Sequence, residues 1–226
     1  MAEREIILDT ETTGLRPDEG HRVVEIGCIE LVNYVPTGRV YHVYVNPERP
    51  MPAEAFSVHG LSDDFLRDKP LFGAVAEEFL EFVGDSPVIA HNARFDMGFV
   101  NAELTRIRRG ILSPPRLIDT ADMARRKFPG APASLDALCR RFNIDNSSRT
   151  KHGALLDAEL LAEVYIELTG GRQTSLDMAA GGTLVVEETT IVVQTWPDRV
   201  FAASDAELAA HAEFVANLKE PIWLLP

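Results

Sequence analysis

The chain has 226 residues, a net charge of −13, an apolar fraction of 46% and a charged fraction of 25%. This length suits one good-sized domain plus a smaller attachment, and the composition is ordinary for a globular protein. The acidic balance argues against nucleic-acid binding through a broad basic surface, but it does not exclude an enzyme that reaches phosphates through bound cations. No apolar stretch approaches the roughly 20 residues of a membrane helix, and two isolated cysteines suit a reducing compartment, so we expect a cytoplasmic protein with no membrane contact.

The first predicted element is a buried strand that ends in a loop. Ile6, Ile7 and Leu8 precede Asp9-Thr10-Glu11-Thr12-Thr13-Gly14. Side chains alternate along a strand that rises roughly 3.3 Å per residue, so Asp9 and Glu11 should point the same way, about 6–7 Å apart. Unpaired carboxylates there would repel each other, and a nearby divalent cation would remove the repulsion. A metal site would need further ligands from later in the chain.

The next segments predict a meander of strands followed by alternating helices and strands. Turn-forming stretches at 16–20 and 33–38 separate strands at 22–32 and 38–45, and such short connections favour antiparallel pairing. Ser62 should cap a short helix after the Pro-rich loop. Later helices are expected at 71–83, 95–107, 120–127, 134–142 and 154–168, and strands at 87–90 and 116–120. This order predicts a mixed α/β sheet flanked by helices.

The composition changes at Gly170. Residues 1–170 are expected to form one domain, whereas 171–182 are small and polar, as in a flexible linker. Residues 183–226 form a further segment, which contains a β-prone stretch at 183–196 and a helix at 204–218. Ser204 and Glu207 have the spacing of a capping box. The apolar end at 221–226 is typical of a docking surface, and packing against its own domain is the alternative.

Asp96, His152 and Asp157 are the candidates that complete the acidic site. Asp96 falls in the first turn of a predicted helix, and Asp157 lies early in another. Five residues at about 100° each leave His152 and Asp157 offset by roughly 140°, so a regular helix would not aim both side chains at one point. We therefore expect His152 in the preceding loop, with Gly153 permitting the turn.

Four carboxylates and one imidazole suit phosphodiester hydrolysis with two hard divalent cations. Magnesium prefers oxygen ligands and keeps several waters. Two such ions about 3.5–4 Å apart stabilise the attacking and the leaving oxygen of a displacement at phosphorus. An imidazole at the edge can take the proton from the attacking water. Asp119 and His91 nearby are interpreted as a helix cap and a structural histidine.

The sequence resembles the DEDDh 3′-to-5′ exonucleases, and among them the proofreading epsilon subunits of bacterial DNA polymerase III. Three motifs carry the resemblance in order, at 9–14 (DTETTG), 91–96 (HNARFD) and 152–157 (HGALLD). The resemblance implies a ribonuclease H-like fold with a five-stranded mixed sheet and a flexible interaction tail. It also implies an enzyme that releases nucleoside monophosphates from single-stranded or frayed DNA 3′ ends.

The same resemblance assigns roles to individual residues. Asp9 would bridge two Mg²⁺ or Mn²⁺ ions, Glu11 and Asp157 would complete one site, Asp96 would bind the second ion, and His152 would be the general base. The terminal nucleotide would contact Asp9, Glu11, Asp157 and the further positions Thr12, Leu15, Glu54, Ala55, His59 and Phe95. For His59, a hydrogen bond that stabilises its loop is the alternative.

The residues after Gly170 resemble segments that bind other proteins of the replication machinery. Gln173, Leu176 and Met178 are similar to a peptide that binds the sliding clamp, although Asp177 departs from that pattern. Residues 204–211 and the end of the chain resemble the segment that docks on the polymerase III alpha subunit, and the family suggests a small theta-like subunit in a nucleoid-associated replisome. Two rival functions stay open at this point: an RNA-trimming exonuclease of the same fold, and a noncatalytic adaptor between clamp and polymerase.

Overall fold

The computed structural model describes residues 3–147, 149, 151–170 and 203–217. These residues fall into two units, which hold residues 3–170 and 203–217. The predicted linker at 171–182 and the β-prone stretch at 183–196 lie outside the described residues, so the domain boundaries stay predictions. No helix in the described ranges is long and apolar enough to span a bilayer.

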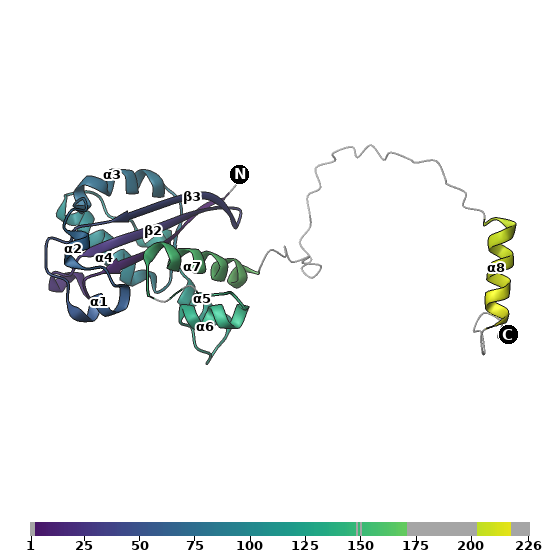
Figure 1. Cartoon of the computed structure of the whole chain (residues 1–226). Coiled ribbons are helices and arrows are strands. Elements are labelled where there is room, and N and C mark those ends of the chain that lie inside the picture. Colours follow the sequence, from purple (N-terminus) through teal and green to yellow (C-terminus); the bar gives the residue numbers. More distant parts are fainter. Residues whose placement is uncertain (1–2, 148, 150, 171–202, 218–226) are drawn as a thin grey trace, which may run out of the picture. The chain divides into compact units, whose positions relative to one another are not determined.

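Residues 3–170 are built on a five-stranded mixed sheet (Figure 1). The strand order is β3-β2-β1-β4-β5. The first three strands form the predicted antiparallel meander, and β1, β4 and β5 run parallel to one another. The strand bounds are β1 Arg4–Thr12, β2 Val23–Val32, β3 Val35–Tyr44, β4 Val88–Ala90 and β5 Leu117–Asp119. The predicted mixed sheet is therefore confirmed.

The hairpin between β2 and β3 is tighter than predicted. The turn consists of Asn33 and Tyr34, both with positive φ (51° and 62°), so the third strand starts at Val35 rather than at Gly38. A two-residue turn of this kind matches the twist of antiparallel strands. Pro36 is tolerated because β3 is the edge strand. Gly38, expected in the turn, has a φ of 84° inside the strand, near the register shift of β2 on β3.

Helices cover both faces of the sheet and enclose two hydrophobic cores. Ile6 and Leu8 pack in the core that includes Phe79 and Phe99 of α3 and α4, whereas Ile7 packs in the core of α5, α6 and α7. Because side chains alternate along β1, this one strand contributes residues to the hydrophobic core on each face of the sheet. The helix bounds are α1 Ala53–His59, α2 Asp63–Leu66, α3 Phe72–Val83, α4 Ala93–Arg106, α5 Thr120–Lys127, α6 Leu135–Phe142 and α7 Ala154–Thr169, with 3-10 turns at Pro17–Glu19 and Pro114–Arg116.

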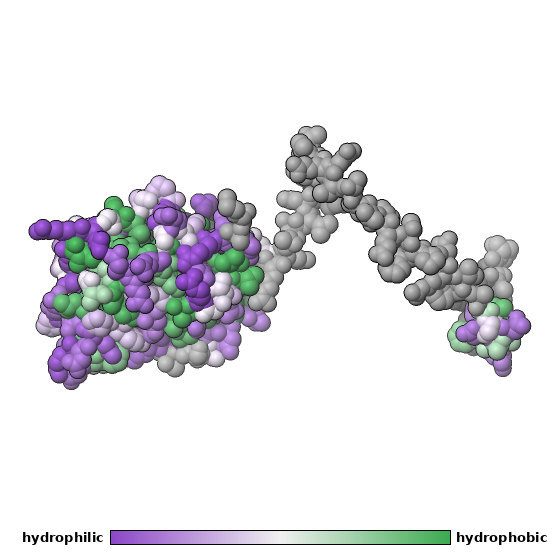
Figure 2. Space-filling view, turned by 90° about the horizontal axis from the view of Figure 1, so that it is seen from above, coloured by the Kyte–Doolittle hydropathy of each residue, from purple (hydrophilic) through white to green (hydrophobic). Residues whose placement is uncertain are grey.

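The predicted helix caps are confirmed in both units. The Ser62 hydroxyl accepts a hydrogen bond from the Phe65 backbone N–H, and in residues 203–217 the capping box of Ser204 and Glu207 begins α8, which spans Asp205–Ala216. Leu208 and Phe214 of α8 are 55% and 63% exposed. Figure 2 shows that hydrophilic side chains cover much of one face of residues 3–170, with small hydrophobic patches between them.

Candidate active site

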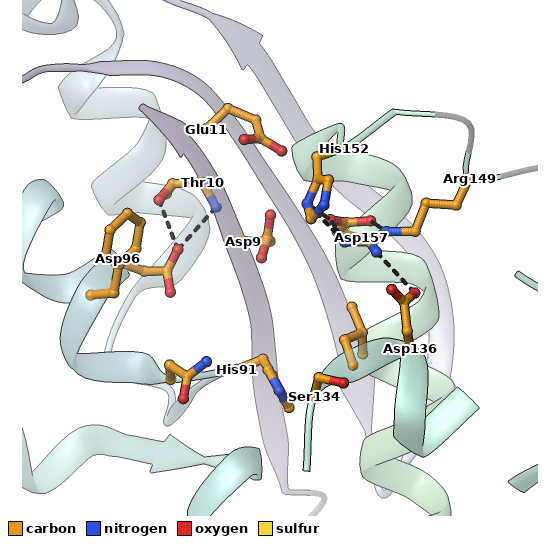
Figure 3. Close-up of a pocket in the computed structure, with 13 residues that line it drawn as sticks. Asp9, Thr10, Glu11, His91, Asp96, Ser134, Asp136, Arg149, His152 and Asp157 are labelled. Carbon is orange, nitrogen blue, oxygen red and sulfur yellow. Dashed lines mark hydrogen bonds and ion pairs between the residues drawn. The ribbon is translucent and has the colours of Figure 1, made fainter. Parts of the chain in front are cut away.

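The five predicted catalytic residues line one cavity of about 310 Å³ (Figure 3). Asp9 and Glu11 come from the end of β1, and Asp96 comes from the first turn of α4. Asp157 projects from the first turn of α7, and His152 directly precedes that helix. Residues up to 148 positions apart in the sequence therefore meet at one end of the parallel strands.

Gly27 allows α7 to approach the sheet beside Asp9. Gly27 pairs with Asp9 across β1 and β2. A Cβ atom at Gly27 would lie only 2.4 Å from the carbonyl carbon of Ala154 and 2.5 Å from the nitrogen of Leu155. Only glycine leaves this space. The first turn of α7 thus packs directly on β2, which places Asp157 next to the carboxylates of β1.

Asp96 is fixed to β1 by Thr10. The Asp96 side chain is buried, and its Oδ1 accepts hydrogen bonds from the backbone N–H of Thr10 (3.1 Å) and from the Thr10 hydroxyl (2.7 Å). Thr10 was not among the predicted site residues. Its position between Asp9 and Glu11, on the opposite face of the strand, is the signal that could have identified it.

Asp119 caps helix α5, as predicted, and it also binds the backbone at the start of α4. It accepts hydrogen bonds from the backbone N–H of Ala121 at the start of α5. It also accepts from the backbone N–H groups of Asn92 (3.1 Å) and Ala93 (3.0 Å) at the start of α4. One carboxylate therefore holds the starts of two helices, and through α4 it sets the position of Asp96.

His152 lies outside the helix, as predicted, but not for the predicted reason. Gly153 has an extended backbone (φ −157°), and a Cβ there would meet nothing within 4 Å. Any residue adopts that conformation, so glycine is not needed for the turn. His152 is held instead by its backbone N–H, which donates to the carbonyl of Val58 (3.2 Å). Its Nδ1 lies 3.2 Å from Oδ2 of Asp157.

Arg149 and Asp136 also belong to the site, and the sequence reasoning missed both. Arg149 makes a two-pronged ion pair with Asp157 and contacts Asp136 and His152 (Figure 3). Arg149 lies three residues before His152, inside the segment that leads into the third motif. One arginine among many in the chain forms no distinctive pattern, so only the folded geometry reveals the contact.

The environment of the carboxylates raises their pKa values. Burial raises the pKa of Glu11 to about 8, and repulsion from Asp157, Glu25 and Asp96 adds to the rise. Burial also raises the pKa of Asp96 to about 7, although its hydrogen bonds from Thr10 oppose the change. The pKa of Asp9 lies well above its usual range because of burial and the neighbouring carboxylates. Such a cluster is relieved when a cation binds to it.

The donor atoms fit a hard divalent cation. Glu11, His152 and Asp157 each offer a ligand atom, and these atoms lie within 4.8 Å of one another. Asp9 and Asp96 line the same cavity but fall outside this close group. Carboxylate oxygens with one imidazole are typical ligands of Mg²⁺ or Mn²⁺.

A second cavity of about 420 Å³ adjoins the first and contains the remaining predicted contacts of the substrate. Thr10, Glu11 and Phe95 line both cavities. His59 is buried there, and its Nδ1 accepts a hydrogen bond from the backbone N–H of Leu61 (3.0 Å). His59 thus makes the hydrogen bond expected to stabilise its loop, and its contact with the substrate stays a prediction. The other predicted residues on this cavity are Thr12, Leu15, Glu54 and Ala55.

The predicted clamp-binding residues Gln173, Leu176 and Met178 lie outside the described residues. His91 is held by a hydrogen bond between its Nδ1 and the Thr120 hydroxyl (2.9 Å), in line with a structural role, and it also lines the first cavity.

Comparison with known proteins gives consistent matches. The family model described as "Exonuclease" matches residues 6–165. The DNA polymerase III subunit epsilon of Rickettsia conorii is 51% identical over 229 residues, covering 95% of this chain and 96% of the relative. The DNA polymerase III subunit epsilon of Escherichia coli K12 is 46% identical over 220 residues, covering 92% and 90%. The solved structure of exonuclease X with 5′-overhanging duplex DNA matches with a TM-score of 0.57 and 26% identity, covering 73% and 90%.

Proposed function

The chain belongs to the exonuclease family and groups with the epsilon subunits of DNA polymerase III, and on this basis we propose that it removes mispaired nucleotides from DNA 3′ ends. Its activity is that of a metal-dependent 3′-to-5′ exonuclease. The observation that supports it best is the meeting of Asp9, Glu11, Asp96, Asp157 and His152 in one cavity. Water displaces the 3′ oxygen of the terminal phosphodiester and releases a nucleoside monophosphate.

The carboxylates would hold the metal ions. Asp9, Glu11 and Asp157 would bind one ion, and Asp96 with Asp9 would bind the other. Two Mg²⁺ or Mn²⁺ ions would stabilise the charge on the attacking and leaving oxygens. The raised pKa values of Glu11 and Asp96 support this assignment, because burial penalises their charged forms and a bound cation would offset that cost.

The protein side chains supply the proton transfer and the positioning. His152 takes the proton from the attacking water, and its partial exposure (46%) leaves it accessible to that water. Thr10 keeps Asp96 in place through two hydrogen bonds. The second cavity, with Phe95 at the junction with the first, would hold the terminal base and sugar. A cavity of this size suits one nucleotide.

Replacement of Asp9 and Glu11 by Ala tests the site. We expect this double variant to lose nucleotide release in a Mg²⁺-dependent assay on a 3′-labelled oligonucleotide, while its circular dichroism stays unchanged. The matched control replaces Glu78 and Glu81 by Ala on the exposed face of α3, which also removes two carboxylates. Unchanged release by the site variant would refute the assignment. Turnover of single-stranded DNA against RNA, in the same assay, tests the choice of DNA.

The proposal extends to the cellular partners. The relatives cover nearly the whole chain and are named as subunits of DNA polymerase III, which supports the proposal that this chain works in a bacterial replisome in the cytoplasm. Residues 183–226 would dock on the polymerase alpha subunit, and Gln173, Leu176 and Met178 would bind the sliding clamp more weakly. A small theta-like subunit is a further candidate partner. The exposed Leu208 and Phe214 of α8 support a docking role for that helix.

A further inference from the structure

Arg149 is placed where a cation is needed in the acidic cavity. Its side chain is only 9% exposed. Nε donates to Oδ1 of Asp157 (2.5 Å) and Nη2 donates to Oδ2 (2.6 Å), so the guanidinium engages both oxygens of that carboxylate. Paired hydrogen bonds of this kind, between two charged groups, are among the strongest in proteins.

The same guanidinium reaches two further groups. Nη2 lies 2.8 Å from Nδ1 of His152, and because arginine is always a donor, Nδ1 is the acceptor. Nη1 donates to Oδ1 of Asp136 (2.9 Å), which also accepts from the Asn146 side chain (3.0 Å). Asp136 is 44% exposed. Asp136 thus holds the guanidinium from the rim of the cavity, and the same guanidinium pairs with Asp157 inside the cavity.

This arrangement conflicts with metal binding at the same carboxylate. Glu11, His152 and Asp157 are the described residues whose ligand atoms gather within 4.8 Å of one another. Arg149 is bonded to two of the three, Asp157 and His152. A guanidinium and a divalent cation on one carboxylate repel each other, and an Nδ1 lone pair that accepts from arginine is not free to accept a proton.

We propose that Arg149 is a counter-cation that neutralises Asp157 and occupies Nδ1 of His152 while the site lacks metal, and that it gives up both contacts when metal binds. Asp136 keeps hold of the guanidinium in both states, because it lies at the rim and not among the metal ligands. Arg149 is therefore a positioning residue: when metal binds Asp157, Arg149 also leaves Nδ1 of His152, and that nitrogen becomes free to accept a proton. This inference rests on the metal site of the proposed function.

Metal affinity without DNA provides the test. Arg149→Met keeps the apolar stem and removes the charge. We expect it to raise the affinity of the full chain for Mn²⁺, measured by isothermal titration calorimetry, by about tenfold, since a charged hydrogen-bonded competitor is lost. We also expect the melting temperature to fall in EDTA but to change little with saturating Mn²⁺.

Arg22→Met is the matched control. Arg22 makes an equivalent two-pronged pair with the buried Glu103 (2.6 and 2.8 Å), outside the cavity. Its loss should lower the melting temperature equally with and without Mn²⁺ and leave the Mn²⁺ affinity unchanged. If Arg149→Met behaves like this control, the pair with Asp157 is merely structural and the inference is wrong.

Arg149→Lys keeps the test decisive if the Met variant does not fold. Lysine retains the charge but cannot engage both carboxylate oxygens, so we expect a Mn²⁺ affinity between those of the wild type and Arg149→Met. An affinity equal to or below wild type would overturn the inference. Failure of Mn²⁺ to bind the wild type would instead overturn the metal site itself, which separates the two hypotheses.

Discussion

His152 and Asp157 are neighbours with opposite exposure. The His152 side chain is 46% exposed, whereas that of Asp157 is 3% exposed. A general base has to exchange protons with water in each turnover, whereas a metal ligand benefits from a fixed and dry position. The difference in exposure therefore matches the different roles proposed for the two residues.

Replacement of His152 by Ala should affect catalysis far more than binding. We expect the single-turnover rate of hydrolysis to fall by about 10²–10⁴-fold, which is the usual contribution of a general base, while the dissociation constant for a single-stranded oligonucleotide stays within a few-fold. Rapid quench and fluorescence anisotropy measure the two quantities. His211→Ala, on exposed α8, is the control histidine. A defect confined to binding would exclude His152 as the base.

The stability of the metal-free protein should fall as the pH rises. The pKa of Asp96 is raised to about 7 and that of Glu11 to about 8, whereas an unfolded chain releases these protons near pH 4. Between these limits the folded state binds more protons than the unfolded state, so the free energy of unfolding decreases with increasing pH. Melting temperatures in EDTA should therefore drop between about pH 4 and about pH 8 and level off at higher pH.

Magnesium should counteract the fall in melting temperature with rising pH, because it binds the deprotonated carboxylates. The rise in melting temperature on adding Mg²⁺ should be larger at high pH than at low pH. Glu11→Gln removes one of the titrating groups and should flatten the curve measured in EDTA. A melting temperature in EDTA that rises across this range would contradict the assigned pKa shifts.

At the scale of elements, the contact between α7 and β2 sets the geometry of the site. Gly27→Ala would place a Cβ within 2.5 Å of the α7 backbone, which cannot yield as a flexible side chain would. We expect a loss of about 1–3 kcal/mol of stability, as in other overpacked sites, and a large loss of activity because Asp157 shifts away from Asp9. Chemical denaturation and the oligonucleotide assay measure the two effects.

Gly98→Ala is a suitable control for this prediction. Gly98 lies in α4, and a Cβ there meets nothing within 4 Å. Alanine in a helix interior is favoured over glycine by ~1 kcal/mol, so this change should stabilise the protein slightly. If Gly27→Ala proves as well tolerated as Gly98→Ala, close packing at Gly27 does not position Asp157.

Local signals explain which parts of the structure were predictable. The caps at Ser62 and Ser204 and the strand that carries Asp9 and Glu11 depend on neighbouring residues, and all were predicted. Asp96 and Asp157 were candidates from their positions early in predicted helices, but only the resemblance assigned them to one site, because nothing local brings them together. The turn predicted at 33–38 is too long, because the two-residue turn at Asn33 and Tyr34 lacks the usual glycine. The roles of Gly27 and Arg149 arise from contacts between distant segments, which no local pattern encodes.

At the scale of the whole molecule, the residues of the site and both hydrophobic cores belong to the first described unit. Every residue that lines the two cavities falls between Asp9 and Asp157, and both cores end by Leu168. A domain that buries its own cores can fold alone. The residues after Gly170 are therefore not needed to build the exonuclease site.

Truncation after Gly170 should separate catalysis from assembly. We expect residues 1–170 to degrade a free oligonucleotide at a rate close to that of the full chain, because the complete site is retained. The same fragment should fail to retain the purified polymerase alpha subunit in a pull-down, because the proposed docking segment is absent. Leu208→Asp with Phe214→Asp in the full chain tests the exposed apolar residues of α8 directly, since charged side chains oppose burial at an interface. Retention of alpha by the truncated fragment would place the docking surface on the exonuclease domain instead.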